Sequence, residues 1–122
     1  METDRLPFSL AEYGERLKAT RTAMAAEGID ILIVANPSNM HWLTGYDGWS
    51  FYVHQAVIVS LTDEPVWWGR PMDAVGAQKT TYLADDSIFS YPDDYVQNPQ
   101  KHAYEHLCGI LRDKGWDHLR IG

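Results

Sequence analysis

The residues best suited to chemistry in this sequence are His102, Glu105 and His106, which are spaced as H-x-x-E-H. In zinc hydrolases with this motif, two histidines one helical turn apart bind the metal and the glutamate serves as the base. On a helix the three side chains lie opposite an apolar arc and would therefore face water. That arc consists of Tyr104, Leu107, Ile110 and Leu111. A catalytic zinc also needs a third protein ligand and a dry pocket, and few residues follow the motif to supply either. We therefore expect a solvated helix face with no metal ligands, and a small metalloenzyme is the alternative.

An aromatic segment over residues 46–54 is the second candidate for chemistry. Its aromatic residues follow neither the helical nor the strand period, so the pattern does not assign them to a core. Aromatic side chains on a loop suit a surface that grips a ligand or a partner, and their faces attract cations. On this ground Trp49, Tyr52 and His54 are candidate substrate-proximal residues. A small core beneath a long loop, or a subunit interface, explains the segment equally well.

Cys108 is the only cysteine, so the chain can form neither an internal disulfide nor a thiolate-rich metal site. We expect its thiol to pack beside Leu107 and Leu111 rather than act as a nucleophile. A single cysteine favours a reducing compartment, and residues 1–7 contain no apolar signal segment. The longest apolar run, over residues 29–35, is too short to span a bilayer. A cytoplasmic protein without a membrane partner is expected.

Composition limits the domain organisation and the partners. A chain of 122 residues with 45% hydrophobic and 22% charged residues suits one folded domain. Its net charge of -7, with scattered Lys and Arg, leaves no basic face to neutralise phosphates. Nucleic acid is therefore not expected as a partner.

The elements that must position these residues alternate between helices and strands. Ser9 and Glu12 form a capping box before a helix that Gly28 should end, and an apolar strand buried on both faces follows over residues 29–35. A short helix is expected next, over 38–44, and then an antiparallel hairpin of strands 56–61 and 65–68. A short helix opening at Arg70 and Pro71 and a short strand over 87–91 should follow. The last expected helix is capped by Asn98, has Pro99 at its first position and ends near Gly115. This order predicts an α/β fold, three-layer-like, with a mixed β-sheet of about five to six strands flanked by helices.

The last residues, Leu119–Gly122, begin another apolar alternation and no polar tail follows them. This ending predicts that the chain is a piece of a longer protein. The alternative is a short final strand that ends there.

Several of these motifs together resemble a known family. The helix from Tyr13 to Gly28, the strand that follows, Asn36-Pro37-Ser38-Asn39 and Trp42-Leu43-Thr44-Gly45-Tyr46 are similar to the N-terminal domain of the creatinase, prolidase and aminopeptidase P family. The resemblance covers residues 10–122. Within the family, segment 44–55, Trp68-Gly69-Arg70 and Asp73-Ala74 look most like the ectoine hydrolases, which open the ring of a cyclic amidine solute.

The resemblance implies a creatinase/prolidase-type N-terminal domain over residues 1–122 that supplies no catalytic residue. The family's C-terminal pita-bread domain, absent from this chain, carries the catalytic centre; its ligands are two Asp, one His and two Glu in the peptidases, whereas creatinase works without metal. No cofactor is expected here, and a divalent metal in the parent's catalytic domain stays open. Expected partners are that C-terminal domain, a second copy in a homodimer, and a small zwitterionic or dipeptide substrate.

The family also implies a role for the aromatic loop. Dimers of this family commonly place an N-terminal loop of one subunit beside the active site of the other, and in creatinase an aromatic residue and an Arg of this loop hold the substrate. Phe51 matches the aromatic residue, whereas Val53 occupies the Arg position, which disfavours creatine. The expected function is therefore to shape the pocket and dimer of an ectoine hydrolase-like C–N hydrolase. The alternatives are the N-terminal domain of an Xaa-Pro dipeptidase or aminopeptidase, and a free-standing module that binds a small zwitterion.

Overall fold

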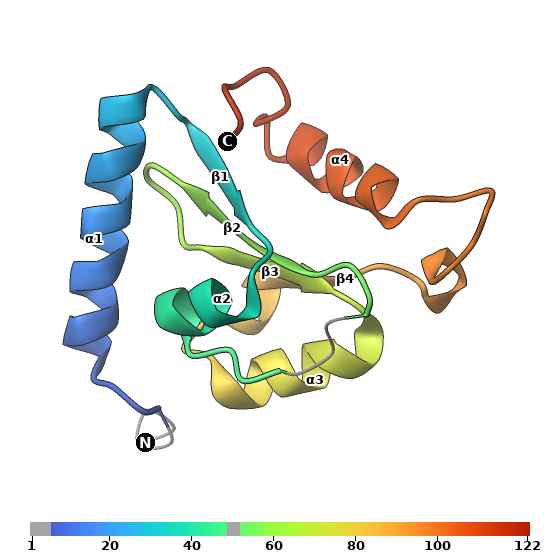
Figure 1. Ribbon diagram of the computed structural model, residues 1–122, viewed down its shortest axis with the longest axis horizontal. Helices are drawn as coiled ribbons and strands as arrows, with labels where there is room; N and C mark the ends of the chain where they lie inside the picture. The colour runs from blue at the N-terminus through green and yellow to red at the C-terminus, as the bar shows by residue number, and fades with distance from the viewer. Residues whose placement is uncertain (1–5, 49–51) are drawn as a thin grey trace.

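A mixed β-sheet lies at the centre of the computed structural model, which describes residues 6–48 and 52–122. Within these residues the sheet has four strands in the order β1-β2-β3-β4: Ile31–Val34, Ala56–Ser60, Val66–Gly69 and Ile88–Ser90. The first two neighbouring pairs are antiparallel, and β3 and β4 are parallel. In the same residues four α-helices accompany the sheet: α1 (Leu10–Glu27), α2 (Pro37–Thr44), α3 (Pro71–Thr80) and α4 (Ala103–Asp113). Two short 3-10 helices span Asp85–Ser87 and Asp93–Tyr95. Figure 1 shows α4 above the sheet, α3 below it and α1 alongside. The predicted α/β class with helices flanking a mixed sheet is confirmed.

The two faces of the sheet belong to two different cores because side chains alternate along each strand. Ala56, Ile58 and Trp68 pack with α4, in a core that also holds Leu107 and Leu111. Alternate positions on the same strands face the other three helices. The core on that face consists of Val57, Val59 and Trp67 together with Met24, Met40, Leu43, Tyr46, Ala77 and Leu83. Neighbouring tryptophans on β3 thus anchor opposite layers.

Local capping explains where the first helices begin and end. Ser9 Oγ accepts a hydrogen bond from the Glu12 N–H at 3.1 Å, and Gly28 closes α1 with a left-handed backbone at φ 71°. Asn36 caps α2 by accepting from the N–H groups of Ser38 and Asn39, and Gly45 ends it at φ 83°. The predicted first helix, the short second helix, the hairpin and the helix opening at Pro71 are all confirmed.

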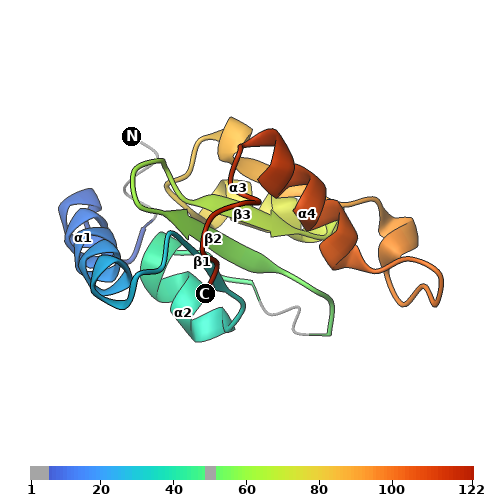
Figure 2. The same ribbon diagram turned by 90° about the horizontal axis from the view of Figure 1, so that it is seen from above.

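The chain returns to the first strand at its C-terminus. Ile121 pairs in parallel with Ile31, and the N–H of Gly122 donates to Ile31 O at 2.8 Å. Figure 2 shows the C-terminus beside β1. In the described residues this contact is a single bridge rather than a strand, so the expected count of five to six strands is too high. Because β1 lies at the edge of the sheet, only Ile31 of its residues is fully buried. Its other side chains are half-buried, Ile33 against one core and Leu32 and Val34 against the other, so both faces of the strand are covered.

The predicted start of the last helix was also wrong. Asn98 Oδ1 accepts from the Gln100 N–H, which makes a local turn, while α4 begins at Ala103 with His102 as its cap. The thiol of Cys108 is exposed rather than packed in the core, because it lies on the outer face of α4. No helix among residues 6–48 and 52–122 has the length and apolarity that a membrane crossing requires.

Candidate functional site

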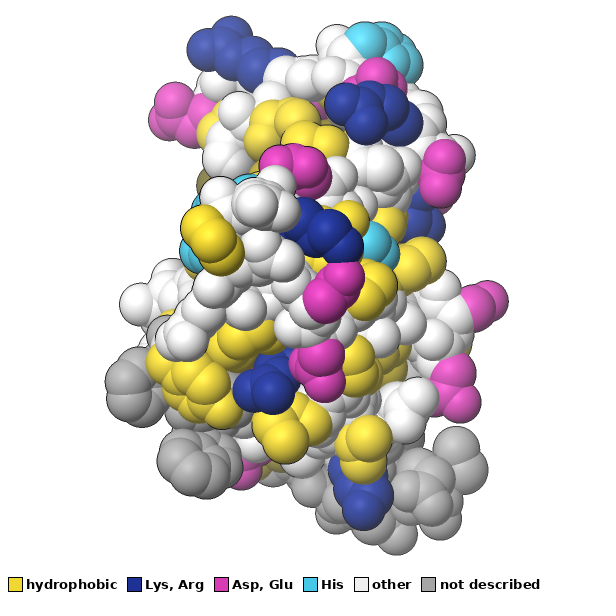
Figure 3. Space-filling view, turned by 90° about the vertical axis from the view of Figure 1, so that its right-hand side faces the viewer, with side chains coloured by type: hydrophobic (Ala, Val, Ile, Leu, Met, Phe, Trp, Pro, Cys, Tyr) yellow, Lys and Arg dark blue, Asp and Glu magenta, His cyan; other side chains and the backbone are white. Residues whose placement is uncertain are grey.

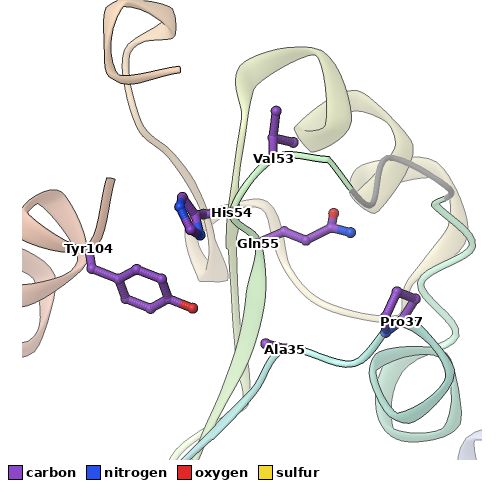
Figure 4. A pocket seen from close by; sticks show the side chains of 6 residues that line it. All are labelled: Ala35, Pro37, Val53, His54, Gln55 and Tyr104. Carbon is purple, nitrogen blue, oxygen red and sulfur yellow. The ribbon is translucent and has the colours of Figure 1, made fainter. Parts of the chain in front are cut away.

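A pocket of about 200 Å³ lies where the sheet meets the end of the aromatic segment. Its lining residues come from three parts of the chain: Ala35 and Pro37 after β1, Val53, His54 and Gln55 before β2, and Tyr104 in the first turn of α4. The antiparallel register pairs Val34 with Val57, so the residue after β1 and the residues before β2 emerge at the same edge of the sheet. Figure 4 shows His54 beside Tyr104 on one side and Gln55 between them and Pro37.

His54 is held by contacts on both its backbone and its ring. The Tyr91 hydroxyl donates to His54 O at 2.7 Å, which fixes the backbone of the segment against the sheet. The imidazole packs against the rings of His102 and Tyr104, with centroid distances of 4.7 and 5.2 Å. Although the residue as a whole is exposed, this partial burial, and secondarily the charge of His102, lower the pKa of His54 below its ordinary value of 6.5. The neutral imidazole is therefore the favoured form.

Gln55 is fixed from the interior of the molecule. It is buried, and its Oε1 lies 2.8 Å from the hydroxyl of Tyr46, which donates to it. Tyr46 in turn follows the left-handed Gly45, where a Cβ would lie 2.9 Å from Thr80 O. Burial, and then the charge of Asp73, raise the pKa of Tyr46, so its hydroxyl stays protonated as a donor. The polar wall of the pocket is thus anchored in the core.

The sequence-predicted site residues are only partly brought together. Trp49 and Phe51 lie outside the described residues. Tyr52 is 58% exposed, and the Arg70 guanidinium donates to its hydroxyl at 3.4 Å while pairing with Asp93 at 2.8 Å. The structure thus places His54 in the pocket and Tyr52 beside an ion pair. Val53 is half-buried and lines the pocket.

The H-x-x-E-H motif has structural roles instead of a metal geometry. His102 Nδ1 accepts from the Tyr104 N–H at 3.2 Å and so caps α4. His106 Nδ1 accepts from the indole N–H of Trp68 at 3.2 Å, and the residue is half-buried. The prediction that His106 faces water was therefore wrong. Among the described residues, no three His, Cys, Asp or Glu side chains are grouped to hold a metal ion.

Chemically, the pocket offers neutral hydrogen-bonding groups beside apolar surface. The imidazole of His54 and the amide of Gln55 are polar, whereas Ala35, Pro37 and Val53 are apolar. Figure 3 shows a face on which basic and acidic side chains are interspersed with hydrophobic ones, so neither charge sign dominates it. Such a pocket can orient a small polar ligand by hydrogen bonds and shape.

Sequence reasoning missed Tyr104, Gln55 and the residues after β1. Tyr104 was assigned to the apolar arc of its helix, yet it is only half-buried and its ring also touches Trp68 at 5.1 Å. A polar aromatic in the first turn of a helix was the available signal. Its proximity to His54, fifty positions earlier, depends on the tertiary fold.

Comparisons with known proteins agree on one family. The family model of the creatinase/prolidase N-terminal domain matches residues 16–122. The chain is 55% identical over 118 residues to the ectoine hydrolase of Halomonas elongata, a match that covers 96% of this chain and 30% of that protein. It is 46% identical over 107 residues to an uncharacterized hydrolase/peptidase of Sinorhizobium fredii, covering 87% of this chain and 27% of the relative. The chain thus spans less than a third of the length of these relatives.

Solved structures with the same fold include N-terminal domains of dipeptidases. The N-terminal domain of an Xaa-Pro dipeptidase from Lactobacillus brevis aligns with a TM-score of 0.67 at 13% identity, covering 82% of this chain and 69% of that one. A proline dipeptidase from Streptococcus pneumoniae aligns with a TM-score of 0.63 at 18% identity, covering 78% and 64%. At these identities the likeness concerns the fold alone.

Proposed function

The chain belongs to the creatinase/prolidase N-terminal domain family, and from this premise we propose that it is the non-catalytic domain of an ectoine hydrolase-like enzyme acting on C–N bonds. In this role residues 1–122 form one domain that shapes the substrate pocket, and a C-terminal domain of the same cytoplasmic protein carries the reactive groups. The observation that carries the proposal is the 55% identity to an ectoine hydrolase over 96% of this chain, at only 30% of that enzyme's length.

The pocket geometry is consistent with a domain that helps to orient a small zwitterionic substrate. His54 and Gln55 offer neutral hydrogen-bonding groups, and each is fixed by a tyrosine hydroxyl from the core. Val53 presents an apolar surface where creatinase has an Arg, so it gives no bidentate partner to a carboxylate. The substrate's carboxylate is therefore held by groups outside this pocket.

The proposed assembly is a homodimer in which the aromatic segment 46–54 of one subunit borders the reaction centre of the other. The exposed Tyr52 and His54 contribute to that border. This domain holds no cofactor, and any divalent metal belongs to the C-terminal domain.

The test is kinetic and uses the longer protein that carries this domain. His54→Gln should raise the KM for ectoine by about tenfold and change kcat by less than about threefold, because a residue that only orients the substrate contributes mainly to binding. His118→Gln is the matched control, since His118 is an exposed histidine paired with Asp117 at 3.8 Å. An unchanged KM in the His54 variant would contradict the role assigned to the pocket.

Two further measurements separate the alternatives. Calorimetry of the 122-residue chain with ectoine should give weak or no binding, since a half-site lacks its other wall; tight one-to-one binding would favour a free-standing binding module instead. Hydrolysis of Xaa-Pro dipeptides but not of ectoine by the longer protein would reassign the domain to a peptidase.

A further inference from the structure

The first turn of α4 depends on a neutral histidine. His102 Nδ1 accepts from the Tyr104 N–H at 3.2 Å, and Glu105 N–H donates to His102 O at 2.9 Å. A backbone N–H can only donate, so this Nδ1 must carry no proton. Protonation of His102 at Nδ1 removes the helix cap and adds a positive charge at the helix N-terminus, where cations are unfavourable.

A second neutral histidine joins the same helix to the sheet. The indole N–H of Trp68 on β3 donates to His106 Nδ1 at 3.2 Å. An indole nitrogen is only a donor, so a protonated His106 loses this bond and leaves the indole N–H of a fully buried tryptophan unpaired. The His106 ring also contacts the edges of Tyr91 and Tyr95, at 6.4 and 6.0 Å.

The third imidazole, that of His54, lies in the pocket wall and contacts the first turn of α4. His54 lies 4.7 Å from His102 and 5.2 Å from Tyr104, centroid to centroid. Two protonated imidazoles at that separation repel each other, and because both residues are exposed, solvent screens part of this repulsion. Protonation of both rings therefore weakens the contact between His54 and the first turn of α4.

The surrounding charges offer little compensation. Beside His102, Lys101 adds a further cation, held by Asp94 at 2.5 Å and lying over the Tyr95 ring at 5.2 Å. Glu105 is exposed on α4. The Tyr91 ring, which contacts His106, is itself acted on by the charges of Asp73, Arg70 and Asp93. Among residues 6–48 and 52–122, no ion pair joins a carboxylate to these three imidazoles.

We propose that His54, His102 and His106 form a proton-sensitive latch that strengthens the attachment of the first turns of α4 and of His54 to the sheet at neutral pH and weakens it on acidification. The latch itself is a property of this chain. Its consequence, weaker substrate orientation at acidic pH, rests on the proposed function.

The sign of the effect follows from linkage. Burial, with a further contribution from His102 at His54, lowers the pKa of both His54 and His106 below the ordinary 6.5. The folded chain therefore binds fewer protons at these sites than the unfolded chain does. Their stabilisation is complete above pH 6.5 and is lost as the pH falls from 6.5 through the lowered values.

The test is urea unfolding of the 122-residue chain between about pH 7.5 and about pH 5.5, a range above the titration of ordinary carboxylates. The folding equilibrium constant should fall at least about fivefold across this range. The variant His54→Gln, His102→Asn, His106→Asn retains acceptor atoms that cannot titrate, so its folding constant should stay nearly flat. His118→Asn is the control and should keep the fall of the parent chain.

A second readout needs no variant. The indole N–H nuclear magnetic resonance of Trp68 should shift and exchange faster as His106 is protonated, while the protein remains folded. Three outcomes would each overturn the latch. The folding constant of the parent chain could be independent of pH, or that of the triple variant could fall as much as the parent's. The third is a Trp68 signal that does not titrate. Neither measurement involves turnover or ligand, so a failed latch leaves the proposed function standing, and a failed function leaves the latch standing.

Discussion

At the level of single residues, the hydroxyl of Tyr91 links the pocket segment to the residue that follows β4. It donates to His54 O at 2.7 Å from a ring that is buried against Trp68. Tyr91→Phe keeps the ring but removes the donor, so the free energy of unfolding should fall by about 1 kcal/mol in urea denaturation. Tyr95→Phe, whose hydroxyl forms no hydrogen bond to a described residue, should change it by less than about 0.5 kcal/mol. Equal losses in both variants would refute this role for Tyr91.

The buried tyrosines also set an alkaline limit to stability. Burial, with smaller contributions from Glu64 and Asp73 respectively, raises the pKa values of Tyr82 and Tyr91 to about 12. Unfolded chains lose these protons near pH 10, so the stabilisation is complete below pH 10 and disappears as the pH rises toward 12. Phenolate absorbance should therefore rise together with the loss of circular dichroism. Full ionisation of all tyrosines near pH 10 in a chain that is still folded would contradict this.

One residue that lines the pocket, His54, was singled out from the sequence as a candidate substrate-proximal residue. His54 stood out because an imidazole follows a loop rich in aromatic residues, and the structure places it in the pocket. Tyr104 could not be found in this way, since a tyrosine on the apolar arc of a helix is normally a core residue. Which of its neighbours it touches depends on how α4 crosses the sheet.

At the level of elements, replacing two different glycines by alanine should change stability in opposite directions. Gly45 ends α2 at φ 83°, where a Cβ would meet Thr80 O at 2.9 Å and the Tyr13 hydroxyl at 3.1 Å. Gly45→Ala should therefore destabilise the fold by at least about 2 kcal/mol. Gly14 lies inside α1, and a Cβ added there would have no neighbouring atom within 4 Å, so Gly14→Ala should stabilise by about 1 kcal/mol. Chemical denaturation of both variants checks the pair, and a neutral Gly45→Ala would show that the close approach is relaxed at no cost.

Element boundaries were predictable where a single local signal determined them. Ser9 and Gly28 bound α1 as expected, because the Ser9 hydroxyl accepts from the Glu12 N–H and Gly28 adopts the left-handed backbone that ends the helix. Before α4, both Asn98 and His102 can accept backbone hydrogen bonds, and the sequence cannot rank them. Asn98 forms a turn with Gln100, next to Gln97, whose positive φ of 51° changes the direction of the chain. His102 therefore provides the cap of α4.

At the level of the whole molecule, the sheet separates two cores, and the pocket lies at one of its edges. One core holds α4 and Trp68, and the other holds α1, α2, α3 and Trp67. The pocket lies where the strand ends β1 and β2 meet the first turn of α4. Its position depends on both the packing of α4 and the hairpin register, so it emerges only from the assembled fold. This arrangement suits a domain that contributes a wall to a reaction centre completed by other residues.

The most direct measurement is ectoine ring opening, followed by nuclear magnetic resonance, with the 122-residue chain alone and with the longer protein that carries it. We predict turnover by the longer protein and none by the chain alone at equal concentration. Turnover by the chain alone would contradict the central claim that this domain shapes a pocket without supplying the chemistry.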